Sequence, residues 1–229
     1  FHGTYNIKNK FKKFYNSVMV KSKLTIAGSN FIFNHINDNY VKYLKEKNKL
    51  LVIFRGINLN YYNPKQISDL KLLKLKKEWQ VDEDKFKVLL PGRLTNWKGQ
   101  INFIEALNIL IEDYKNDNFQ AFILGSDQGR NVYKKKLQSL IERYNLGKKI
   151  KFIEHCKEMP LAYAISDVVI SSSIEPEAFG RVSVEAQAMQ KPIIATNLGG
   201  SKETIVNNKT GILYKFDDPR ELAKNINSF

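Results

Sequence analysis

The chain has little of what marks a disulfide-stapled, metal-binding or membrane-spanning protein. Its 229 residues include one cysteine, Cys156, and three histidines, so no internal disulfide can form and the composition suits a reducing, cytoplasmic compartment. Cys156 follows His155, but no second cluster of potential ligands accompanies the pair, which favours a structural role over a metal site. No apolar run approaches the length that spans a bilayer.

Negative charge is scarce relative to positive charge. The formal net charge is +14, and residues 1–84 carry 16 Lys and Arg against 7 Asp and Glu. Such a basic region can meet nucleic acid, an anionic membrane surface or a phosphorylated substrate. No recognisable nucleic-acid-binding pattern accompanies it, so we expect no nucleic-acid partner. An anionic membrane face is the more economical partner, and a lysine-rich surface that serves solubility alone is the alternative.

The region from residue 85 to 229 alternates short apolar strands with helices. This alternation predicts an α/β domain whose parallel sheet is covered on both faces. The expected strands are 86–91, 119–125, 150–153, 167–171, 192–196 and 211–214. The expected helices are 99–115, 131–145, 158–165, 180–190, 201–207 and 219–227.

The region before residue 64 reads as a smaller piece of α/β structure. Strands are expected at residues 24–29 and 50–54, with Ser29 or Asn30 capping a helix between them. Ahead of them, Phe11 and Phe14 belong to a basic amphipathic helix, a pattern more typical of packing on a core than on a membrane. Residues 64–84 are charged, contain a short helix and are predicted to connect the two domains.

One stretch, residues 174–189, lies between two buried strands and predicts a loop followed by a helix. A helix that begins near Gly180 leaves the amides of Phe179 to Val182 without backbone acceptors, at the positive end of the helix dipole. Such an end at the carboxyl edge of a parallel sheet is a ready anion site. Arg181 adds a positive charge beside it.

Two carboxylates bracket this helix start. Glu177 lies in the loop, and Glu185 lies inside the helix, where a carboxylate among apolar residues needs a hydrogen-bond donor such as a ribose diol. A solvated loop residue and an exposed helix carboxylate are the alternatives. Paired carboxylates also suggest a glycosidase.

The segment from Glu177-Ala178-Phe179-Gly180 to Glu185, with Gly199-Gly200 after the next strand, resembles the donor-binding motif of retaining GT-B glycosyltransferases. That family uses nucleotide sugars and includes sucrose synthase and bacterial mannosyl- and N-acetylglucosaminyltransferases. The resemblance implies two Rossmann-like domains, with Glu177 facing the donor sugar and Glu185 holding the ribose. Gln190 stands where many relatives have a glycine ending the helix; a left-handed conformation there would cost about 1 kcal/mol and leave the chemistry unaltered.

The loop that follows the strand at 86–91 also matches the family. Gly92 and Arg93 come directly after this strand, and Lys98 precedes Gly99. In the resembled family the matching arginine and lysine hold the donor diphosphate, which argues against the glycosidase. Without the resemblance these would be two ordinary surface cations. The predicted donor-binding residues are Gly92, Arg93, Lys98, Glu177, Phe179, Gly180, Arg181, Val182 and Glu185.

The resemblance further implies retention of configuration, no metal or other cofactor, and a hexosyl or N-acetylhexosaminyl transfer from a UDP- or GDP-sugar. The acceptor would be a lipid or saccharide in cell-envelope polysaccharide, lipopolysaccharide or glycolipid synthesis, at the inner face of the membrane. Residues 1–63 would be the end of the acceptor-side domain, 64–84 the linker and 85–229 the donor domain. His2 resembles the family's cleft histidine and joins Glu177 as a candidate catalytic residue.

The sequence leaves the activity open in two ways. Strand–helix units that usually precede Phe1 in the family are absent, so we expect a truncated first domain and a fragment that binds donor without transferring sugar. A nucleotide-sugar-binding module without catalysis is one alternative. A GT-B enzyme of another kind, such as a nucleotide-sugar 2-epimerase, is the other.

Overall fold

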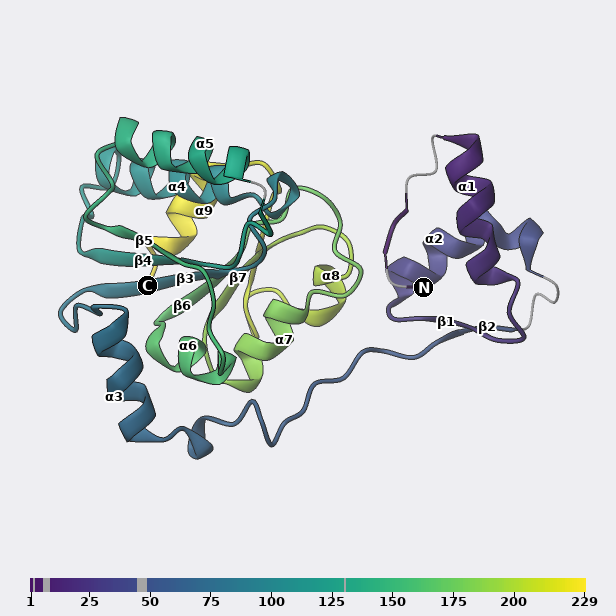
Figure 1. Cartoon of the computed structure of the whole chain (residues 1–229), viewed down its shortest axis with the longest axis horizontal. Helices are drawn as coiled ribbons and strands as arrows, with labels where there is room; N and C mark the ends of the chain where they lie inside the picture. Colours follow the sequence, from purple (N-terminus) through teal and green to yellow (C-terminus); the bar gives the residue numbers. More distant parts are fainter. Residues whose placement is uncertain (2, 6–8, 45–48, 130) are drawn as a thin grey trace.

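The computed structural model describes residues 1, 3–5, 9–44, 49–129 and 131–229. His2, a candidate catalytic residue, lies outside the described residues. The chain forms two sheets in separate regions, joined by an extended segment and a helix (Figure 1). The α/β class that the sequence predicts is confirmed.

The larger sheet has six strands in the order β5-β4-β3-β6-β7-β8, and every pairing is parallel. The order reverses between β3 and β6, whose following helices leave to opposite faces of the sheet. In open α/β sheets the crevice at such a reversal, beyond the carboxyl ends of the strands, is the usual ligand position. The strands are β3 Phe86–Pro91, β4 Phe119–Leu124, β5 Ile150–Ile153, β6 Val168–Ser171, β7 Ile193–Thr196 and β8 Ile212–Tyr214.

Successive residues of a strand point to opposite faces, so this sheet builds two cores. Val88 and Leu90 pack with the helices on one face, and Leu89 packs with those on the other. Helices α4, α5 and α9 lie over the first face, and α3, α6 and α7 over the second (Figure 1). The helices are α3 Asp69–Glu78, α4 Gln100–Glu112, α5 Asn131–Arg143, α6 Met159–Ile165, α7 Arg181–Ala188, α8 Ser201–Thr204 and α9 Pro219–Ile226.

The expected strands and helices of this domain are all present, with ends that differ by a few residues. The clearest difference is α8, which stops at Thr204 because Ile205 adopts an extended conformation and is buried. Gln190 does have a left-handed backbone, with φ at 57°. The connecting helix α3 packs against α6, and Trp79 at its end is buried against Phe122.

The smaller region contains the parallel pair β1 Thr25–Ala27 and β2 Leu50–Val52 and the helices α1 Lys10–Asn16 and α2 Asn30–Tyr40. Short 3-10 turns cover residues 17–20 and 41–43. Ser29 caps α2 as expected, since its hydroxyl accepts a hydrogen bond from the amide of Ile32 at 3.1 Å. The core of the region lies between α2 and the two strands.

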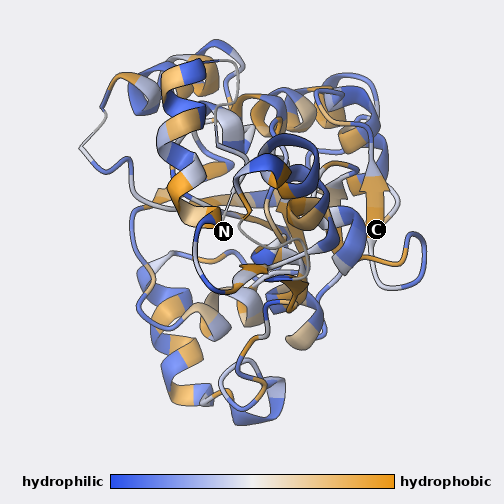
Figure 2. Cartoon of the chain, turned by 90° about the vertical axis from the view of Figure 1, so that its right-hand side faces the viewer, coloured by the Kyte–Doolittle hydropathy of each residue, from blue (hydrophilic) through white to orange (hydrophobic). Residues whose placement is uncertain are grey.

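Helix α1 does not pack on a core, and that expectation is wrong. None of its residues is buried, and the side chains of Phe11 and Tyr15 are 88% and 78% exposed. Hydrophobic and hydrophilic residues alternate along the ribbons near the N-terminus (Figure 2). Helical spacing predicts the helix itself but not what lies against its apolar residues.

Candidate functional site

Two loops meet at the switch point of the large sheet. The loop after β3 runs from Gly92 through a 3-10 turn, Asn96–Lys98, and the loop after β6 runs from Ser172 to Gly180. They are joined by the amide of Ile174, which donates to the carbonyl of Trp97 at 2.9 Å. Between them lies a cavity of about 560 Å³. Its lining residues include Thr4, Arg55, Arg93, Trp97, Lys98 and residues 175–182.

An ion pair joins the two loops inside this cavity. The Lys98 ammonium lies 2.7 Å from Oε1 of Glu177, and the two side chains are only 14% and 11% exposed. The ammonium also lies 4.4 Å from the ring centroid of Trp97. Ser173 donates its hydroxyl to the same Glu177 oxygen at 2.6 Å. Both donors use Oε1. The other oxygen, Oε2, accepts no hydrogen bond from any described residue.

The turn that carries Lys98 is held by Ser172, the residue that directly follows β6. The Ser172 hydroxyl lies 3.0 Å from each of the carbonyl oxygens of Lys98 and Gly99. Gly99 has a φ of 70°, and a Cβ there would lie 1.9 Å from the carbonyl oxygen of Ser172. Only glycine fits this position, so the close contact of the two loops depends on it.

The start of α7 has the predicted anion-binding geometry. Gly180 precedes the helix with φ at 88°, a left-handed conformation suited to glycine, and no side chain caps the helix. The amides of residues 179–182 donate no hydrogen bond to the described part of the chain. These N–H groups and the helix dipole together favour an anion in the cavity.

The cavity is rich in positive charge. Arg55, Arg93, Lys98 and Arg181 line it against the carboxylates Glu175 and Glu177. Arg93 is exposed at the mouth and forms no ion pair within the described residues. The predicted donor-binding residues that line this cavity are Gly92, Arg93, Lys98, Glu177, Phe179, Gly180, Arg181 and Val182.

Glu185 is the predicted donor-binding residue that does not line the cavity. It is only 6% exposed, and its two oxygens accept from the Tyr163 hydroxyl at 2.8 Å and from Arg181 at 2.9 Å. Burial and the Glu185 charge raise the pKa of Tyr163, and the same causes raise that of Tyr62 to about 12. The Glu185 charge also raises the pKa of Arg181. Each carboxylate oxygen can accept a second hydrogen bond, so Glu185 keeps acceptor capacity for a ligand.

Sequence reasoning missed the contacts that dock the first region onto this site. The Ser29 hydroxyl donates to the carbonyl of Ala178 at 2.5 Å. The Glu203 carboxylate accepts from the amides of Asn30 and Phe31 at 2.8 and 2.6 Å. The start of α2 is therefore fixed beside the loop that carries Glu177.

Other cavities lie around the domain. One of about 240 Å³ lies at the ends of β4 and β5, next to Gly125, Glu154 and Cys156. Burial raises the pKa of the Cys156 thiol, which donates to the Glu158 carbonyl, in keeping with a structural role. Within the described residues no cluster of three or more potential metal ligands is found.

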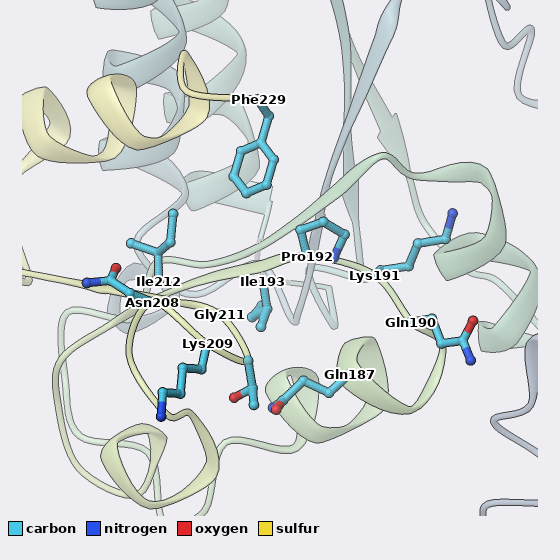
Figure 3. A pocket seen from close by; sticks show the side chains of 11 residues that line it. Gln187, Gln190, Lys191, Pro192, Ile193, Asn208, Lys209, Gly211, Ile212 and Phe229 are labelled. Carbon is cyan, nitrogen blue, oxygen red and sulfur yellow. The ribbon is translucent and has the colours of Figure 1, made fainter.

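A larger cavity of about 750 Å³ lies at the opposite edge of the sheet (Figure 3). Ile193 and Ile212, at the amino ends of β7 and β8, line it together with Phe229. It shares no lining residue with the switch-point cavity. Open parallel sheets bind ligands at the carboxyl ends of their strands, so the switch-point cavity is the candidate functional site.

The comparisons with known proteins agree with this geometry. Residues 73–229 match the family model "Glycosyl transferases group 1". The chain belongs to this family and has the GT-B glycosyltransferase fold. Across the described residues, no helix is long and apolar enough to cross a membrane.

Solved structures and a curated relative are similar over much of the chain. A glycosyltransferase from Rickettsia africae ESF-5 is 39% identical with a TM-score of 0.86, covering 100% of this chain and 58% of that one. Anabaena Alr3699/HepE, solved in complex with UDP and glucose, is 27% identical with a TM-score of 0.86, covering 100% and 60%. Spore coat protein SA of Bacillus subtilis is 32% identical over 79% of this chain and 49% of its own length. The chain thus spans about half the length of that curated relative.

Proposed function

We propose that the chain binds a UDP- or GDP-sugar at the switch point and serves a glycosyltransferase that moves the sugar, with retention, to a lipid or saccharide acceptor. The observation that carries this proposal is the Lys98–Glu177 pair in a cavity with Arg93 and the free amides of α7. The cations and amides suit a diphosphate, and the carboxylate suits a sugar hydroxyl. The presence of UDP and glucose in the HepE structure supports the donor class.

The reaction chemistry follows from the leaving group. When the sugar departs, negative charge grows on the nucleoside diphosphate, and prearranged donors stabilise that charge. Arg93, Lys98 and the first amides of α7 supply these donors. We propose that they do the work that a divalent metal does in other transferases. Glu177 Oε2 then faces the sugar as it leaves.

The direct test is calorimetry with UDP, GDP and uridine, with and without EDTA. Arg93→Ala and Lys98→Ala should each weaken binding of the diphosphate by about tenfold or more, the range for a charged hydrogen bond. Uridine binding should stay nearly unchanged, and EDTA should have no effect. Arg220→Ala, which removes the exposed partner of Asp113, is the matched control. Equal losses of affinity for UDP and uridine would mean that the two residues stabilise the fold and do not bind the phosphates.

We also propose that the first region approaches an anionic membrane surface, where a lipid acceptor would lie. Phe11, Phe14 and Tyr15 on α1 are exposed, and Lys10, Lys12 and Lys13 alternate with them. Exposed aromatic residues among lysines suit a headgroup interface, since the rings enter the boundary while the ammonium groups meet anionic lipids. Cell-envelope polysaccharide, lipopolysaccharide or glycolipid synthesis is the setting that fits such a surface.

A further inference from the structure

Two consecutive serines that directly follow β6 contact both loops of the site. Ser172 holds the turn at Lys98 and Gly99, and Ser173 donates to Glu177 at 2.6 Å. Both serines are nearly inaccessible, at 1% and 2% exposure. This buried dipeptide therefore fixes the turn that carries Lys98 relative to the carboxylate of Glu177.

The two donors to Glu177 differ in what they can do once a ligand is bound. Lys98 lies on a loop that lines the cavity, and its ammonium has three protons that an arriving diphosphate can share or take over. Ser173 does not line the cavity and is 2% exposed, so no ligand in it competes for its hydroxyl. The Ser173 bond is short, as expected for a hydroxyl that donates to a carboxylate.

We propose that Ser173 is the positioning residue of Glu177. It holds Oε1 so that Oε2 stays directed at the donor sugar when Lys98 turns to the diphosphate. A carboxylate without this partner can rotate about its side-chain torsions, and the geometry of the sugar contact is lost. The inference rests on the proposed function, because it needs Glu177 to contact the sugar of a bound donor.

The test compares UDP with UDP-glucose, and GDP with GDP-mannose, by calorimetry on the full 229-residue chain. Its readout is the ratio of nucleotide-sugar affinity to nucleoside diphosphate affinity. In Ser173→Ala we expect UDP affinity within about twofold of the original chain and a ratio lower by about fivefold to twentyfold, the size of a weakened charged hydrogen bond. Ser173→Thr keeps a hydroxyl and should restore the ratio. Ser173→Cys places a weak donor of similar size there, so its ratio should lie between those of Ser173→Ala and the original chain. This variant replaces Ser173→Ala in the test if Ser173→Ala does not fold.

Ser166→Ala is the matched control, because Ser166 is also buried and its hydroxyl donates to a backbone carbonyl, that of Tyr163. An unchanged ratio in Ser173→Ala and Ser173→Cys overturns the inference, and so does an equal loss for both ligands. Glu177→Gln distinguishes the sugar contact of Glu177 from the positioning role of Ser173. If it leaves the ratio unchanged, the sugar contact of the proposed function fails and the role of Ser173 falls with it. If it lowers the ratio while Ser173→Ala does not, only the inference on Ser173 fails.

Discussion

Removal of the Glu203 carboxylate should loosen the first region from the domain that contains the six-stranded sheet. Glu203 accepts from the amides of Asn30 and Phe31 and from the Asn30 side chain, at 2.8, 2.6 and 3.0 Å. These amides belong to the first turn of α2, which has no other acceptor for them within the helix. The carboxylate thus works as a helix cap supplied by another domain.

The size of the effect follows from the capping role. Loss of an N-cap typically costs about 0.5–2 kcal/mol, and a carboxylate near a helix start gains about 0.3–1 kcal/mol from the dipole. Glu203 is exposed, so we take about 1–2 kcal/mol for Glu203→Ala. The undocked population should then rise by about fivefold to thirtyfold, less at high salt. The hydrogen bond from Ser29 to the Ala178 carbonyl and the packing of Ala178 against the core of the first region remain in this variant.

Distance measurements between paired labels can follow this docking. Labels are attached to cysteines introduced at Asn37 in α2 and at Lys209 in the domain with the six-stranded sheet, in a Cys156→Ser background. The distance between the labels reports the separation of the two regions. Glu203→Ala should broaden the distance distribution, and 1 M salt should broaden that of the original chain toward it. Glu83→Gln removes a comparable exposed carboxylate, the partner of Lys76, and should leave the distribution unchanged. Identical distributions in Glu203→Ala and the original chain would refute the capping argument.

Three further predictions concern single sites. Glu185→Ala should weaken UDP binding by about 1.5–3 kcal/mol, because a charged acceptor for the ribose is lost; unchanged affinity in calorimetry would contradict the ribose role. The Cys156 thiol, with its raised pKa and buried position, should react with a disulfide reagent at pH 8 at least about 100-fold more slowly than in the urea-unfolded chain; equal rates would show an open site. The double variant Phe11→Ser with Phe14→Ser should reduce co-sedimentation with phosphatidylglycerol vesicles several-fold. Val132→Ser changes an apolar residue that is 85% exposed in the domain with the six-stranded sheet, and it should leave co-sedimentation unchanged.

The domain with the six-stranded sheet could be predicted from the sequence because its signals are local. Each strand is a short apolar run, and β6 and β7 are buried along their whole length, so their ends fall within one or two residues of the expected positions. The loop before α7 is marked by Gly180, whose φ of 88° favours glycine. The loops after β3 and β6 gather the predicted cavity residues because parallel strands end at one edge of the sheet.

What the sequence could not show is how these side chains pair. Lys98 and Glu177 are separated by 79 residues, and Glu203 and Asn30 by 173. Neither periodicity nor a motif records which cation meets which carboxylate. Tyr163 gave no signal in a helix that reads as ordinary core, because a hydroxyl aimed at Glu185 leaves no mark on the hydrophobic pattern.

The pairing also bears on how a diphosphate would enter the site. Lys98 and Arg181 are each bound to a carboxylate, so their charges are partly balanced before any ligand arrives. Arg93 and the first amides of α7 have no such partner in the described part of the chain. In the proposed function, an arriving diphosphate would meet these groups first, and its charge would then compete with Glu177 for the Lys98 ammonium. Because Gly99 and Ser172 already fix the Lys98 turn, little ordering remains to oppose binding. The Lys98 ammonium would then shift only a short distance from Glu177 to the diphosphate, while the turn that carries it stays in place. Donors that are already in position are what charge stabilisation at a leaving group requires.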